Sequence, residues 1–142
     1  MTAKEYLNRA YEIKSEVNRK NRQIERLKSF AASISVNPIA EKVMSSPSEN
    51  SSVAYFIDMA LDLEKEVSAL TKDLHIAYAS IRSIIAMLDD EEIAMLLTLR
   101  YVEFYSWKRI SKTMNFSEST VFRLHLKGLD MVSKKLTVAD ST

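Results

Sequence analysis

The stretch that decides the fold of the C-terminal third is residues 106–127, which read SWKRISKTMNFSESTVFRLHLK. Ser106 is placed to cap a short helix over 107–114, because a serine hydroxyl accepts hydrogen bonds from the free amides of a first helical turn. Asn115 follows where a tight turn needs a residue that tolerates the left-handed region, and Ser117 is placed to cap a final helix running to about residue 136. The pattern predicts two helices joined by a three-residue turn.

Helical spacing gives each predicted helix of this stretch an inward, apolar side. Ile110 and Met114 face inward from the first helix, Phe116 fills the turn, and Val121 and Leu124 face inward from the second. Ser111 is the small residue needed where the helices cross closely. Helical spacing then turns seven residues outward on the final helix: Ser117, Glu118, Ser119, Phe122, Arg123, Leu126 and Lys127.

The net charge of +1 hides an uneven distribution along the chain. Residues 1–30 carry eight basic and four acidic side chains, residues 89–105 sum to −4, and residues 106–136 carry seven basic and two acidic side chains. Asp89, Asp90, Glu91 and Glu92 precede an apolar helix predicted over 93–102, where carboxylates cap free amides and oppose the helix dipole. Four consecutive residues splay around a helix axis, so we interpret them as caps and not as a metal site.

The N-terminal part predicts two long amphipathic helices, over 2–33 and 53–88, that fold back as an antiparallel pair. Lys20 interrupts the first apolar seam, either to set register or because it lies near an exposed end. Serine-rich residues 35–52 are predicted to be a linker, with a short extra helical turn over 39–44. A two-helix hairpin has little core, so we expect a further chain to cover it, either a second copy or a foreign helix.

Composition agrees with an all-α fold. One Gly and two Pro leave little with which to build hairpin turns, and the absence of Cys excludes disulfides and thiolate metal sites. We predict a long antiparallel helical hairpin over 1–88, a helix-turn-helix DNA-binding domain over 89–136 and a tail over 137–142. The N-terminus and the lack of a long apolar run predict an unprocessed cytoplasmic protein with no membrane partner.

Residues 89–136, about a third of the chain, resemble region 4 of bacterial sigma factors and the related sigma-like activator domains. The resemblance rests on Leu99-Arg100-Tyr101, the Ser106 cap, Ile110-Ser111, and Ser117 with Ser119-Thr120-Val121. Phe104 stands where that family usually has Gly, and Lys108-Arg109 where acidic residues are common. Long helices followed by such a domain resemble ArpU-like and RinA-like phage regulators of Gram-positive bacteria, which implies a phage or prophage transcriptional regulator.

If the final helix enters the major groove, the sequence predicts two sets of residues that contact DNA. Arg123 is suited to guanine, Glu118 to a cytosine amine and Phe122 to a thymine methyl. The full set predicted to read bases is Ser117, Glu118, Ser119, Phe122, Arg123 and Lys127. The set predicted to contact the DNA backbone is Ser106, Lys108, Arg109, Lys112, Lys134 and Lys135.

The remaining candidates favour structure over chemistry. We interpret Trp107 as a packing residue, and His75 and His125 as lacking the spacing of metal ligands. No catalytic motif is found, and the single Gly128 excludes the glycine-dependent ones, so we predict no enzymatic activity and no cofactor. We expect a homodimer or higher homo-oligomer on double-stranded DNA. The alternative is a helical adaptor that binds RNA polymerase or a sigma factor without touching DNA.

Overall fold

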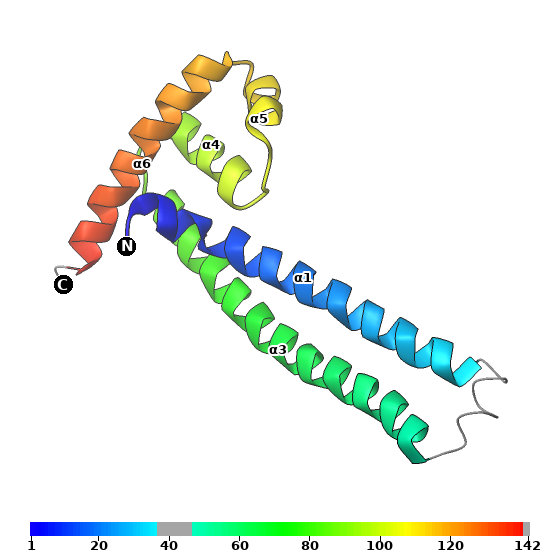
Figure 1. Ribbon diagram of the computed structural model, residues 1–142. Coiled ribbons are helices and arrows are strands. Elements are labelled where there is room, and N and C mark those ends of the chain that lie inside the picture. Colours follow the sequence, from blue (N-terminus) through cyan, green and yellow to red (C-terminus); the bar gives the residue numbers. More distant parts are fainter. Residues whose placement is uncertain (37–46, 141–142) are drawn as a thin grey trace. The chain divides into compact units, whose positions relative to one another are not determined.

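The computed structural model describes the backbone of residues 1–36 and 47–140, and helices make up most of both ranges (Figure 1). In chain order the helices are α1 (Ala3–Val36), α3 (Pro47–Ala86), α4 (Glu91–Tyr101), α5 (Trp107–Met114) and α6 (Glu118–Asp140). The described ranges contain no strand, so the predicted all-α class is confirmed. None of the helices described is both long and apolar enough to cross a membrane.

The bounds of the helices correct the predicted linker. α1 continues to Val36 and α3 begins at Pro47, so both ends of the segment predicted as a linker over 35–52 are helical. Proline suits a first helical position because its φ is already fixed near the helical value. Serine is also tolerated in a helix, at a cost of about 0.5 kcal/mol relative to alanine. The helical turn predicted over 39–44 lies outside the described residues.

The C-terminal helices follow the predicted bounds closely. α5 covers the predicted range, and α4 begins two residues before its predicted start because Asp90 accepts a hydrogen bond at Oδ1 from the Ile93 amide at 3.0 Å. α6 continues to Asp140, so the predicted tail over 137–142 begins inside a helix.

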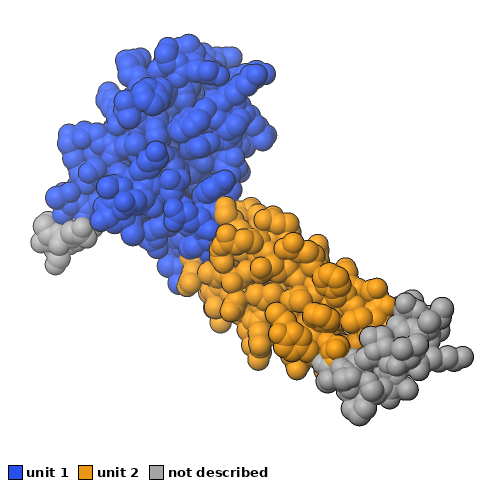
Figure 2. Space-filling view, in the orientation of Figure 1, with its two compact units in different colours: residues 1–13, 74–142 blue, residues 14–73 orange. Residues whose placement is uncertain are grey.

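The chain divides into two compact units, residues 1–13 with 74–142, and residues 14–73 (Figure 2). The domain boundary predicted at residue 88 therefore lies inside the first unit. Each unit contains parts of both long helices, because α1 and α3 each contribute residues to both.

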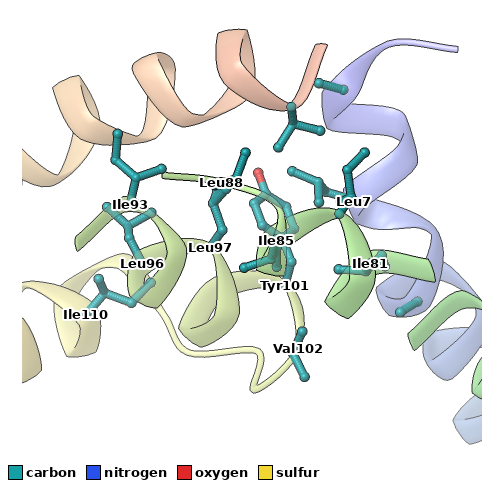
Figure 3. Packing of buried hydrophobic residues seen from close by; sticks show 14 of the residues in the cluster. Leu7, Ile81, Ile85, Leu88, Ile93, Leu96, Leu97, Tyr101, Val102 and Ile110 are labelled. Atoms are coloured by element: carbon teal, nitrogen blue, oxygen red, sulfur yellow. The ribbon is translucent and has the colours of Figure 1, made fainter. Parts of the chain in front are cut away.

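One hydrophobic core holds the first unit together. It joins the start of α1, the end of α3 and all of α4, α5 and α6 (Figure 3). Its largest fully buried side chains are Leu7, Ile81, Ile93, Leu96, Leu97, Ile110, Val121 and Val132. The C-terminal helices therefore do not have a core of their own, because Leu7 and Ile81 belong to the long helices.

A close crossing of α4 and α6 depends on Gly128. A Cβ atom at this position would lie 2.9 Å from Cγ2 of Ile93 and 3.3 Å from Cδ1 of Leu97, and both neighbours are fully buried. Real Cβ atoms do not approach so closely, so the absence of a side chain lets the two helix backbones meet.

The second unit is an antiparallel pair made by residues 14–36 of α1 and residues 47–73 of α3. Lys20 Nζ lies 2.8 Å from Glu66 Oε2, Lys28 Nζ lies 2.7 Å from Glu64 Oε1, and the Phe30 and Phe56 rings stack at 6.0 Å. The predicted hairpin is thus confirmed, and its apolar seams pair within one chain. Lys20 interrupts the seam because it bridges the two helices, with Glu16 also within 3.4 Å.

Candidate nucleic-acid interface

Helix caps hold the two-helix motif formed by α5 and α6. The Ser106 hydroxyl accepts a hydrogen bond from the Arg109 amide at 3.2 Å, and the Ser117 hydroxyl accepts one from the Thr120 amide at 3.2 Å. Both caps fall where the sequence predicts them. Each satisfies an amide that the first turn of a helix leaves without a partner.

The turn between α5 and α6 is closed by Asn115 and Ser111. Asn115 has φ 59° and ψ 39°, the left-handed conformation predicted for it. The Phe116 amide donates to the Ser111 carbonyl at 3.1 Å, and the Ser111 hydroxyl donates to the Phe116 carbonyl at 2.5 Å. Ser111 was predicted as the small residue at the helix crossing, and this reciprocal pair of hydrogen bonds is an additional role.

The inner side of the motif is buried as predicted. Ile110 and Val121 are 0% and 1% exposed, and Met114, Phe116 and Leu124 are partly buried against the same core. Because these residues fix the orientation of α5 and α6 about their helix axes, they also determine which residues of α6 face solvent.

Residues of the first turns of α6 form an exposed surface, which we call the α6 face: Ser117, Glu118, Ser119, Phe122, Arg123, Leu126 and Lys127. Two of its members are large apolar side chains, Phe122 at 62% exposed and Leu126 at 51%. Beside Phe122 is a cavity of about 360 Å³ lined by Trp107, Lys108, Glu118, Val121 and Phe122. The α6 face thus combines polar groups with an apolar patch.

α5 carries three exposed cations, one of which adjoins the α6 face. Lys108, Arg109 and Lys112 are all exposed, and Lys108 lines the cavity beside Phe122. The Arg109 guanidinium carbon lies 3.7 Å from the centroid of the Tyr105 ring, a cation-π contact that restricts this side chain. The Ser106 hydroxyl is also exposed, although it already accepts a hydrogen bond as a helix cap.

The two lysines predicted at the far end of α6 differ from the cations of α5. Lys134 is exposed but lies 3.1 Å from Asp130 on the same helix. Lys135 is partly buried and lines a cavity of about 420 Å³ together with Tyr6 of α1 and Met87, just beyond α3. Lys108 of α5 is therefore the cation that lines the cavity at the α6 face, whereas Lys134 and Lys135 lie about five turns from the start of that face.

A buried histidine supports the α6 face from behind. His125 is 5% exposed, its Nε2 atom lies 2.5 Å from the Tyr101 hydroxyl, and its ring meets the Trp107 ring edge-on at 4.6 Å. Burial, reinforced by the charges of Arg100 and Lys4, lowers the pKa of His125 to about 4, so the imidazole is neutral at pH 7. This agrees with a packing role for His125 and for the partly buried Trp107.

Arg100 links the cluster of His125, Tyr101 and Trp107 to the segment between α4 and α5. Its guanidinium carbon lies 4.3 Å from the centroid of the Trp107 ring, and Nη1 donates a hydrogen bond to the Tyr105 carbonyl at 2.9 Å. The α5 end of the motif is therefore anchored to the end of α4 by a side chain that the sequence analysis assigned to the sigma-like resemblance alone.

Phe104 adopts a backbone conformation that suits glycine. Its φ is 60°, and its ring contacts Tyr11 of α1 at 5.6 Å and Tyr78 of α3 at 6.1 Å between centroids. An L-residue in this region is strained by about 1–2 kcal/mol. The phenylalanine offsets the strain through contacts that a glycine cannot make.

Among the residues described, no three His, Asp or Glu side chains come together in an arrangement that holds a metal ion. Comparisons with protein-family models, with curated proteins and with solved structures found no match to this chain.

Proposed function

We propose that this protein is a sequence-specific DNA-binding transcriptional regulator, encoded by a phage or prophage, whose α6 face enters the major groove. The observation that carries the proposal is that Arg123 and Lys127 are exposed on the first turns of α6 while Val121 of the same helix is fully buried. A helix held in this way presents its N-terminal residues to base edges.

The chemistry of the adjoining residues supports this proposal. Lys108, Arg109 and Lys112 are exposed cations of α5, and Lys108 lies beside Glu118 and Phe122 of the α6 face. Such cations neutralise phosphates whatever the DNA sequence. On the face itself, Arg123 has the paired donors that suit guanine, and exposed Phe122 offers an apolar surface to a thymine methyl. The sigma-like resemblance of residues 89–136 assigns the same helix to DNA.

Replacement of Arg123 by alanine tests the proposed readout. The purified chain is first used to select its preferred duplex from random sequences, and binding to that duplex and to a random one is then measured for each variant. Arg123→Ala is expected to reduce discrimination by about 1–3 kcal/mol at one base pair, because the arginine contact to guanine is lost. Since Arg123 is exposed, the far-UV circular dichroism should not change.

Two further variants separate base readout from charge. Lys108→Ala is expected to weaken binding to both duplexes equally and to reduce the slope of log affinity against log salt by about one unit. Lys72→Ala removes the same charge from an exposed position on α3 in the second unit and should leave both affinities unchanged. An unaltered sequence preference in Arg123→Ala would refute the assignment.

The exposed apolar patch favours a second candidate function, a helical adaptor that binds RNA polymerase or a sigma factor without DNA contact. Phe122 and Leu126 are more than half exposed, and apolar surface of this kind is typical of protein contacts. Absence of DNA binding at low salt, together with retention of purified polymerase or sigma factor that Phe122→Ser abolishes, would favour the adaptor.

A further inference from the structure

A groove between α1 and α3 in the second unit has an apolar floor that is open to solvent. It has a volume of about 570 Å³ and is lined by Gln23, Arg26, Leu27, Phe30, Met59, Asp62 and Leu63. Phe30 is 58% exposed and Met59 is 38% exposed, while Leu27 and Leu63 are partly buried beneath.

The second unit buries very little apolar surface by itself. Among its described side chains only Ile24, Ala31 and Ala60 are buried hydrophobic residues, and two of the three are alanines. Large side chains on the same helices remain exposed, with Tyr55 at 61% and Leu61 at 48%. The pair therefore leaves exposed apolar surface that contact with a partner would bury.

Charge identifies which partner fits. Residues 14–36 carry six basic and two acidic side chains, whereas residues 47–73 carry two basic and six acidic side chains. One wall of the groove therefore belongs to a helix of +4 and the other to a helix of −4. A second copy of this hairpin offers the complementary pair of walls, since a surface with both signs can match itself across a two-fold axis.

Two charged residues on opposite walls of the groove are available for this contact. Arg26 lies on α1 and Asp62 on α3, both are exposed, and neither takes part in an ion pair within the described residues. Lys20 and Lys28 are instead engaged with Glu66 and Glu64 of the same chain. Among the residues that line the groove, each copy therefore has one cation, Arg26, and one anion, Asp62.

We propose that this groove is a homodimer interface in which α1 of each copy packs against α3 of the other, so that Arg26 meets the partner's Asp62 twice. A two-fold axis parallel to the helices produces this pairing. An axis perpendicular to them would set α1 against α1 and bring the two +4 helices together, which repulsion disfavours. The inference goes beyond the DNA-binding proposal because it concerns a different unit and a different ligand.

The parallel axis also places residues 14 and 73 of both copies at the same end of the resulting four-helix bundle. Both chains continue from that end into their first units, as the connection of α1 and α3 requires.

Charge reversal tests the interface in the full-length chain, by sedimentation velocity at low salt and without DNA. The wild-type chain is expected to be a dimer in the micromolar range. Arg26→Asp and Asp62→Arg should each raise the dissociation constant about tenfold or more, because each creates two like-charge contacts per dimer. Phe30→Ser should have a similar effect through loss of apolar contact, and circular dichroism checks that each variant remains helical.

Mixing the two reversed chains distinguishes contacts between copies from contacts within one. In an equimolar mixture, the aspartate introduced at position 26 of one chain meets the arginine introduced at position 62 of the other, and the unchanged Arg26 and Asp62 form the second contact. A heterodimer should therefore form with an affinity close to that of the wild type, and the doubly reversed chain should likewise recover homodimers. Lys65→Asp makes a matched change of charge on α3, outside the residues that line the groove, and should leave the dimer intact.

Three results would overturn the proposal. These are a wild-type chain that is monomeric throughout the micromolar range, a dimer that tolerates both reversals, and a mixture of the reversed chains that stays monomeric. The first of them would direct attention to a foreign helix as the occupant of the groove. Because no DNA is present, none of these results depends on whether the α6 face binds DNA.

Discussion

At the scale of single residues, His125 shows how a core position supports a surface. Its imidazole is buried behind the α6 face and hydrogen-bonded to Tyr101, and its neighbours are the Trp107 ring and the charge of Arg100. A protonated imidazole in this place would be an ion removed from water beside another cation. The neutral form is therefore the one that the fold accepts.

This arrangement predicts a loss of stability in weak acid. The pKa of His125 is about 4 in the folded chain and near 6.5 in the unfolded one, so the unfolded chain binds more protons between these values. Stability from this group is complete above pH 6.5, falls as the pH decreases, and is lost by pH 4, a change of about 3 kcal/mol.

Urea unfolding at several pH values measures this effect. Carboxylates also titrate over part of the range, so His125→Phe serves as the reference that lacks the imidazole. The free energy of unfolding of the wild type, relative to that of His125→Phe, should decrease by about 3 kcal/mol between pH 7 and pH 4. A difference that does not vary with pH would show that the imidazole is not held neutral.

At the scale of elements, the turn between α5 and α6 depends on one residue with a positive φ. Asn115 has the left-handed conformation, and the reciprocal hydrogen bonds of Ser111 and Phe116 close the turn around it. Asparagine is among the few L-residues that visit this region readily, and glycine does so without steric cost.

Substitutions at Asn115 test this requirement. Asn115→Gly should change the free energy of unfolding by less than about 0.5 kcal/mol, whereas Asn115→Val should reduce it by about 1–2 kcal/mol because a β-branched residue is strained at positive φ. Asn115 is exposed, so loss of packing does not confuse the comparison. Equal stability of the two variants, measured by thermal unfolding, would contradict the role of backbone conformation.

At the scale of the whole molecule, the DNA-binding motif and the base of the hairpin share one core. Leu7 of α1 is completely buried in the same cluster as Ile110 of α5 (Figure 3). Val121 of α6 belongs to this cluster too. We therefore expect the first unit to unfold as one cooperative unit, although its parts, residues 1–13 and 74–142, are far apart in the sequence.

Leu7→Ala is expected to destabilise the motif formed by α5 and α6, although Leu7 is about 100 residues away in the sequence. Loss of a buried leucine costs about 2–5 kcal/mol, and the fluorescence of Trp107, which is the single tryptophan, reports unfolding of the motif directly. Its transition in urea should shift to lower concentration. Leu61→Ala removes the same atoms from a side chain that is 48% exposed in the second unit and should leave the transition almost unchanged.

Local patterns were sufficient for the helices and their caps. Ser106 and Ser117 cap where predicted, Asn115 takes the left-handed conformation, and the inward residues of α5 and α6 are buried. These features depend on neighbours within a few positions in the chain, which spacing reveals. Leu7 is completely buried because it packs against helices far along the chain, a contact that spacing within its own helix does not predict.

What the sequence by itself determined is the helical class, the positions of the turns and the polar or apolar side of each helix. Only the tertiary structure decided the partners: Lys20 with Glu66, the α4 crossing at Gly128, the pairing of Tyr101 with His125, and the joining of residues 1–13 to 74–142. The two kinds of feature differ in how far apart in the sequence the interacting residues are. Caps and periodicity are set by residues within one or two turns, whereas contacts between helices depend on which surfaces meet once the chain has folded.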